Sequence, residues 1–174
     1  MFGGGLLVTA VTIAVMPQNR VVFGVLTCIG SCMLLLIPLD KIIRKIPAEA
    51  GVVLSFGLFV LTRNLNRGFL GFESWKLAAL PEEWYRNLLT AYIGMPSRSF
   101  YSTDYFSLIP WFFLFVTGYN LYAISKKYDW LRGSFWQIRI PVVDFLGKRS
   151  LLVYLLHQPV IYLLQEILRG AGLI

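Results

Sequence analysis

The stretch SLLVYLLHQPV, from Ser150 to Val160, carries the single histidine of this 174-residue chain inside an apolar run. In an α-helix, Ser150, Tyr154, His157 and Gln158 share about one third of the circumference, and leucine and valine cover the remainder. An imidazole can accept or donate a proton near neutral pH. We therefore consider three roles for His157: catalytic proton transfer, lining of a ligand cavity, or hydrogen bonding between helices together with Gln158.

A second polar cluster occurs in FYSTDYFSLIPWFF, from Phe100 to Phe113. Asp104 supplies oxygen atoms suited to a helix N-terminus, so it either caps the helix that begins here or faces a substrate. Tyr105 follows it as a candidate cavity-lining residue. Pro110 predicts a bend one turn into the helix, where Trp111 can reach a polar partner. The sequence holds no P-loop, zinc-ligand pair or nucleophile elbow, and we predict neither a metal site nor a permanently bound cofactor.

The composition indicates that these clusters lie on helices within a membrane. Hydrophobic residues make up 57% of the chain and charged residues 14%, and the mean hydropathy is +0.66. Several apolar runs approach the roughly 20 residues that cross a bilayer. We predict an all-α, polytopic membrane domain over residues 1–174. Its five spans are expected at residues 2–16, 21–39, 48–62, 104–125 and 150–168, with an interfacial helical segment at about residues 72–95.

The charge distribution predicts the orientation of the chain. Its net charge is +7, and the lysines and arginines fall mainly in the connections after the second and fourth predicted spans. This distribution indicates cytoplasmic loops, with a cytoplasmic N-terminus and an external C-terminus, and it argues against a nucleic-acid partner. Short loops favour the inner membrane of a prokaryote. Cys28 and Cys32 lie one helical turn apart and are interpreted as small packing residues.

Three segments together resemble the heparan-alpha-glucosaminide N-acetyltransferase catalytic-domain family. They are FGVLTCIG from Phe23, FYSTDYFSLIPWF from Phe100 and LGKRSLLVYLLHQPV from Leu146. The resemblance implies a multi-helix membrane enzyme that transfers an acetyl or other acyl group from acyl-CoA to an amino sugar or glycan across the lipid bilayer. It carries a possible catalytic role to His157 and binding or cavity-lining roles to the residues Asp104, Tyr105, Trp111, Ser150, Tyr154 and Gln158.

The sequence departs from the family pattern at two of these positions. The family has a histidine where this chain has Thr27, and a proline where it has Ser107. The family pattern also places further spans, an Asp-x-x-Arg-Gly motif and a transfer histidine before the first segment. We therefore expect the chain to be the C-terminal portion of a longer enzyme, and we leave open whether it is active or inactive by itself. The alternative hypothesis is a non-catalytic membrane subunit or small transporter.

Overall fold

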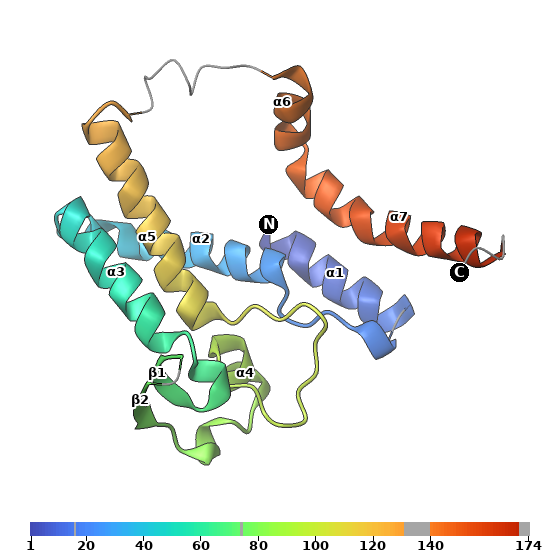
Figure 1. Ribbon diagram of the computed structural model, residues 1–174, viewed down its shortest axis with the longest axis horizontal. Helices are drawn as coiled ribbons and strands as arrows, with labels where there is room; N and C mark the ends of the chain where they lie inside the picture. Colours follow the sequence, from blue (N-terminus) through green and yellow to red (C-terminus); the bar gives the residue numbers. More distant parts are fainter. Residues whose placement is uncertain (16, 74, 131–139, 171–174) are drawn as a thin grey trace. The chain divides into compact units, whose positions relative to one another are not determined.

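Four apolar helices dominate the first part of the computed structural model, which describes residues 1–15, 17–73, 75–130 and 140–170 (Figure 1). Helix α1 covers Phe2–Val15, α2 Val25–Ile43, α3 Ala48–Thr62 and α5 Leu108–Lys127. The chain divides into two units, Met1–Asp129 and Trp130–Ile174. The second unit contains α6, Pro141–Lys148, and α7, Ser150–Gly170.

The prediction of a mostly helical membrane protein is confirmed, although five spans are not. Among the described residues, three helical segments are long and apolar enough to cross a bilayer, at Val25–Ile43, Ala48–Arg67 and Leu108–Lys127. The second of these consists of α3 and the 3-10 helix Leu65–Arg67 that follows it. The first predicted span is the shorter apolar helix α1, of 14 residues. The last predicted span corresponds to α7, of 21 residues.

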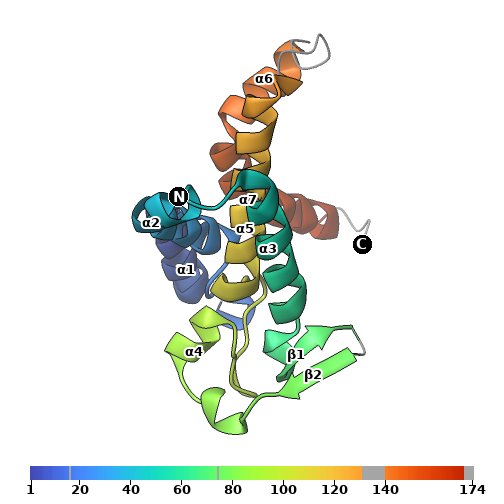
Figure 2. The ribbon, with the colours of Figure 1, turned by 90° about the vertical axis from the view of Figure 1, so that its left-hand side faces the viewer.

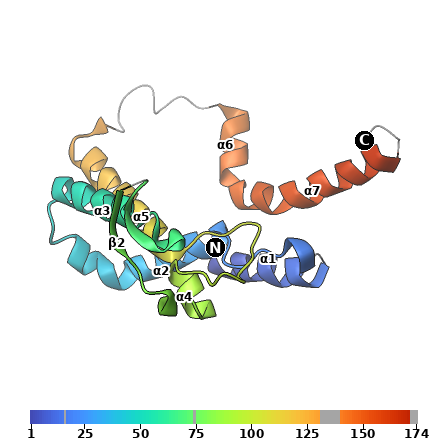
Figure 3. The same ribbon diagram turned by 60° about the horizontal axis from the view of Figure 1, so that its bottom comes forward.

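Helices α3 and α5 lie side by side and pack through small and polar residues (Figures 1 and 3). The hydroxyl oxygens of Ser55 and Thr117 are hydrogen-bonded at 2.8 Å, and both side chains are buried. A Cβ added at Gly51 would lie 2.8 Å from the side chain of Asn120, so the glycine permits this close approach. Because lipid does not drive apolar helices together, such close packing and interhelical hydrogen bonds hold the pair.

Helix α1 packs against the first turns of α2 in the same manner (Figure 2). A Cβ added at Gly5 would lie 2.3 Å from the hydroxyl oxygen of Thr27, and one added at Gly30 would lie 2.4 Å from the backbone nitrogen of Phe2. Cys28 and Cys32 are buried and free. Thr27 and Gly30 of α2 therefore lie at the contact with α1, and the burial of Cys28 and Cys32 agrees with their interpretation as small packing residues.

The predicted interfacial helix is wrong over most of its length. Strands β1, Phe69–Phe72, and β2, Trp75–Ala79, form an antiparallel hairpin, and only Leu88–Ile93 is α-helical, as α4. Gly71 has φ +141°, and a Cβ there would lie 1.9 Å from the carbonyl oxygen of Trp75. Trp75 and Leu77 alternate with Lys76, which is the periodicity of a strand.

The C-terminal ends of α2 and α5 and the N-terminal end of α3 carry charged residues, and these three helix ends lie together on one side of this unit. The Tyr119 hydroxyl on α5 donates to Asp40 on α2, and Asp40 also pairs with Arg44 at 2.8 Å. Lys127, at the end of α5, pairs with Glu49 in the first turn of α3 at 2.7 Å. The two basic connections therefore begin at the same end, and the hairpin and α4 lie at the other end of α3 and α5 (Figure 2).

Candidate functional site

The segment before α5 runs along the segment before α2, so two of the sequence motifs meet. The Thr103 amide donates to the Arg20 carbonyl at 3.1 Å, and the Phe106 amide donates to the Phe23 carbonyl at 2.9 Å. The Ser102 hydroxyl accepts from the Val22 amide and donates to the Val22 carbonyl, each at 2.9 Å. These bonds fix Asp104 and Tyr105 beside the beginning of α2.

Asp104 lies at the N-terminus of α2 and not at the start of its own helix. One carboxylate oxygen accepts a hydrogen bond from the amide of Val25, the first residue of α2, at 3.3 Å. A Cβ at Gly24 would lie 2.9 Å from that oxygen, so the glycine makes room for the carboxylate. A negative charge here is favourable because the first amides of a helix are unpaired and its N-terminus is positive.

Tyr105 points toward α4 on the hairpin side of the unit. Its hydroxyl donates to the carbonyl of Ala91, and its ring meets Phe100 edge-on with centroids 5.1 Å apart. Phe100 stacks in turn on Phe23, at 6.2 Å. Burial raises the pKa of the Tyr105 phenol well above its usual range, so the group is a neutral hydrogen-bond donor at physiological pH.

Trp111 faces a third direction, toward α3. Its ring contacts Phe106 at 5.1 Å and Phe59 of α3 at 5.9 Å, and the residue remains 38% exposed. The bend predicted at Pro110 assumed a helix that begins at Asp104. Because α5 begins at Leu108, Pro110 occupies its first turn, where an amide would have no partner within the helix.

These three predicted residues are therefore neighbours whose side chains diverge. Asp104 binds the end of α2, Tyr105 binds α4 and Trp111 packs toward α3. Together they join three elements around the start of α5. This geometry gives them a clear role in positioning helices, and their predicted role in binding a substrate stays a prediction.

The buried face of α2 extends this polar region into the membrane-spanning part. The Ser31 hydroxyl donates to the Thr27 carbonyl at 2.6 Å and accepts from the Tyr92 hydroxyl of α4. The Cys28 thiol lies 3.7 Å from the Ser107 carbonyl oxygen. The contribution of Tyr92 was not predicted, because its partner Ser31 lies 61 residues away in the sequence.

Thr27 occupies the position at which the resemblance places a histidine. It is 3% exposed, and among the described residues its hydroxyl oxygen has no hydrogen-bond partner. Gly5 of α1 covers that oxygen so closely that a Cβ on the glycine would lie 2.3 Å from it. An imidazole is larger than this side chain, so a histidine here would require α1 to move.

The residues predicted on the last helix lie in the second unit. Ser150 begins α7, and Tyr154 and His157 follow on the same continuous helix, so their spacing of four and three residues places them on one face. The side chains of His157 and Gln158 lie outside the described part of the structure. The roles predicted for these residues therefore stay predictions.

A family of known proteins matches most of this chain. Neither the curated proteins nor the solved structures include a match to this chain. The family model described as heparan-alpha-glucosaminide N-acetyltransferase, catalytic, matches residues 1–159. The matched region includes the segment beginning at Phe23, the segment around Asp104 and the last helix as far as Pro159. The chain belongs to the heparan-alpha-glucosaminide N-acetyltransferase catalytic-domain family.

Proposed function

We propose that this chain takes part in the transfer of an acyl group from a cytoplasmic acyl-CoA to an amino sugar or glycan across the membrane. The observation that carries the proposal is the family match over residues 1–159, which makes the chain a membrane acyltransferase-like protein. Acetyl-CoA is the expected donor, and it would act as a co-substrate that leaves after each turnover.

The chemistry of this reaction defines the role that we assign to His157. The acceptor amine attacks the thioester carbonyl, a C–N bond forms, the C–S bond breaks and coenzyme A leaves as a thiolate. The nitrogen must then release a proton, and a positioned imidazole can accept it. His157 is the only histidine of the chain. Ser150, Tyr154 and Gln158 are proposed to line the path of the acceptor on the same helix face.

We further propose five spans, formed by α1, α2, α3, α5 and α7. The two basic connections begin at the same end of α2, α3 and α5, and this common end supports a cytoplasmic location for both under the positive-inside tendency. The N-terminus would then be cytoplasmic, and the hairpin, α4 and the C-terminus would be external. A prokaryotic inner membrane remains the proposed location.

The test is acyl transfer by the purified chain in proteoliposomes. Radiolabelled acetyl-CoA is supplied on one side and glucosamine on the other, and labelled N-acetylglucosamine is counted. We expect transfer by the unmutated chain, loss of at least tenfold in His157→Ala, and retention in Leu152→Ala, which changes the opposite side of the same helix. Equal transfer by His157→Ala and Leu152→Ala would remove the role of His157.

The packing of Thr27 favours a second candidate, a non-catalytic membrane subunit. Thr27 stands where the resemblance has a histidine, and Gly5 leaves little space for a larger side chain there. A subunit of this kind would bind a catalytic partner and show no transfer by itself. Absence of labelled product from the folded, unmutated chain would favour this candidate over the enzyme.

A further inference from the structure

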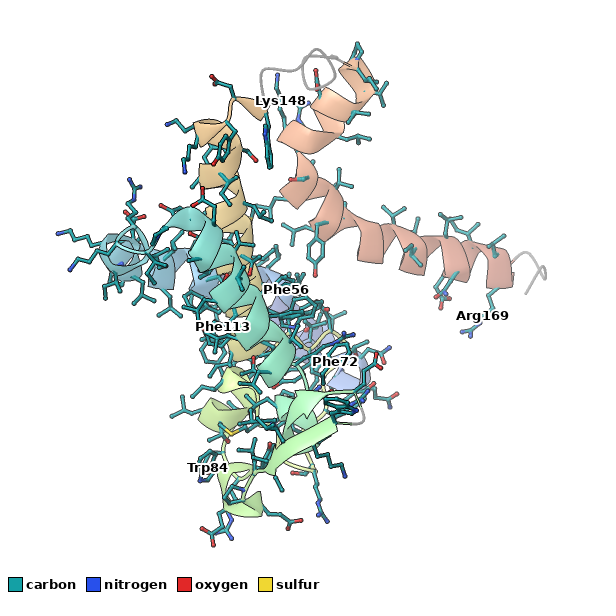
Figure 4. The ribbon with its side chains drawn as sticks, turned by 60° about the vertical axis from the view of Figure 1, so that its left-hand side comes forward. Phe56, Phe72, Trp84, Phe113, Lys148 and Arg169 are labelled. Carbon is teal, nitrogen blue, oxygen red and sulfur yellow. The ribbon has the colours of Figure 1, made fainter. Side chains whose placement is uncertain are left out.

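A groove of about 420 Å³ lies between the C-terminal part of α3 and the β1–β2 hairpin. This volume is within the range of roughly 300 to 1,000 Å³ that is typical of small-molecule sites. Gly57, Val60 and Leu61 of α3 form one side. The hairpin forms the other, and its described lining residues are Gly71, Phe72, Trp75, Lys76 and Leu77. Figure 4 marks Phe72 on the hairpin and Phe56 on the adjoining helix.

The helix side of the groove continues the lipid-facing surface of α3. Val53, Gly57 and Val60 follow one another at intervals of four and three residues, so they share one face of the helix. Val53 is 74% exposed. The helical segment Ala48–Arg67, which contains α3, is long and apolar enough to span a membrane, so we infer that this exposed side chain faces acyl chains. An added Cβ at Gly57 would meet nothing within 4 Å, so the glycine leaves a hollow open to lipid.

On the hairpin side, Trp75 and Leu77 line the groove, and Lys76 between them on β2 also lines it. Trp75 is 86% exposed and Leu77 is 77% exposed. Exposure of both side chains to water would be costly, whereas tryptophan is favoured at the depth of lipid headgroups. The Lys76 ammonium lies 5.6 Å from the centre of the Phe69 ring, and an ammonium has three donors with which to bind a phosphate.

We propose that this groove binds an anionic phospholipid. One acyl chain lies along Gly57, Val60 and Leu61, and the headgroup phosphate binds the ammonium of Lys76. Continuity with the lipid-facing side of α3 identifies the occupant as a lipid, and the positive charge selects an anionic headgroup. This inference goes beyond the proposed acyl transfer, because a phospholipid bound in the groove is neither the acyl donor nor the acceptor of that reaction.

The experiment is native mass spectrometry of the purified chain after lipid removal. Palmitoyl-oleoyl phosphatidylglycerol or palmitoyl-oleoyl phosphatidylcholine is added back, so that the two probes differ only in the headgroup. Gly57→Leu fills the hollow, and Gly118→Leu is its matched control, because an added Cβ at Gly118 on α5 also meets nothing within 4 Å. Lys76→Gln removes the charge and keeps a polar side chain.

We expect one retained phosphatidylglycerol in the unmutated chain and in Gly118→Leu, and its loss in Gly57→Leu. Lys76→Gln should lower the preference for phosphatidylglycerol over phosphatidylcholine about fivefold, because the attraction of one lysine to an anionic membrane surface changes the binding constant by about that factor. Equal lipid retention by folded Gly57→Leu and Gly118→Leu overturns the proposal. A dimer that retains no lipid also overturns it, because a second copy would then occupy the groove.

A measurement on the unmutated chain keeps the proposal testable if Gly57→Leu does not fold. A phosphatidylglycerol with a diazirine in its palmitoyl chain is cross-linked by light, and the modified peptides are identified. Modification should concentrate on the segments that contain Leu61 and Leu77. Modification spread evenly over the apolar residues of α3 and α5 contradicts a specific site.

Discussion

The contact between Asp104 and α2 predicts a measurable loss of stability when the carboxylate is removed. Asp104→Ala removes the acceptor of the Val25 amide and the negative charge at the helix N-terminus. The charge contributes about 0.3 to 1 kcal/mol at such a position. A hydrogen bond to a charged group contributes about 1.5 to 3 kcal/mol. The distance from the Val25 nitrogen to the Asp104 oxygen is 3.3 Å, which is long for a hydrogen bond, so its contribution lies at or below the lower limit of that range. We expect a total loss of about 1 to 2 kcal/mol.

A second variant of Asp104 separates charge from hydrogen bonding, and a variant at another position serves as the control. Asp104→Asn keeps an oxygen acceptor and removes the charge, so about half of the loss should remain. Glu82→Gln is the control, because Glu82 pairs with Arg98 at the surface, where the two side chains are 86% and 91% exposed. Such a pair contributes at most about 1 kcal/mol, and often nothing measurable.

The assay is reversible unfolding of the protein in mixed micelles by dodecyl sulfate, followed by tryptophan fluorescence. A loss of 1 to 2 kcal/mol lowers the ratio of folded to unfolded protein by a factor of about 5 to 30. Midpoints that coincide for Asp104→Ala, Glu82→Gln and the unmutated chain would refute the conclusion that Asp104 stabilises α2.

Three other predictions follow from the packing, the buried phenol and the proposed orientation. Gly51→Leu should prevent folding, since its Cβ would lie 2.8 Å from Asn120; a monodisperse, folded protein in size-exclusion chromatography would contradict this. Tyr105 ionises in the unfolded chain near pH 10, but burial raises its folded pKa. Stability should therefore fall as the pH rises above 10, and less so in Tyr105→Phe, as unfolding at pH 8 and pH 11 will show. In intact cells, an impermeant maleimide should label Glu82→Cys and should not label Lys45→Cys, and the reverse pattern would invert the proposed topology.

The helices of the first unit could be predicted because hydropathy and length report burial in lipid directly. Residues 48–62 were predicted with the same bounds that α3 has. The end of α2 was predicted less well, because the charged side chain of Asp40 suggested a loop. In the structure Asp40 lies within the helix and binds Tyr119 and Arg44, so its charge is accommodated at the helix end.

The hairpin was missed because two periodicities overlap in the same short segment. Leucines and aromatics between Trp75 and Tyr92 fit a helical spacing, whereas Trp75, Lys76 and Leu77 alternate as in a strand. Gly71 permits the hairpin, because its φ of +141° and close approach to the Trp75 carbonyl accompany the register shift in β1. A single glycine gives little signal to a periodicity argument.

Asp104, Tyr105 and Trp111 could be selected from the sequence as candidate residues, but their contact partners could not. Asp104 was recognised from its position before an apolar run, and the helix that it contacts was assigned wrongly, because a cap is usually close in sequence to its own helix. The partner of Tyr105, the Ala91 carbonyl, lies in α4, which itself was not predicted with the correct bounds. Such pairings depend on how helices pack in space.

The contact between Asp104 and Val25 also bears on the order of events during biosynthesis. The two residues are 79 positions apart, which at a synthesis rate of about 5 to 20 residues per second corresponds to roughly 4 to 16 s. During this interval α2 leaves the ribosome and enters the bilayer without the carboxylate that binds its first amide. The N-terminal end of α2 is therefore completed only after α3 and the hairpin have been synthesised, so assembly of this unit cannot finish helix by helix.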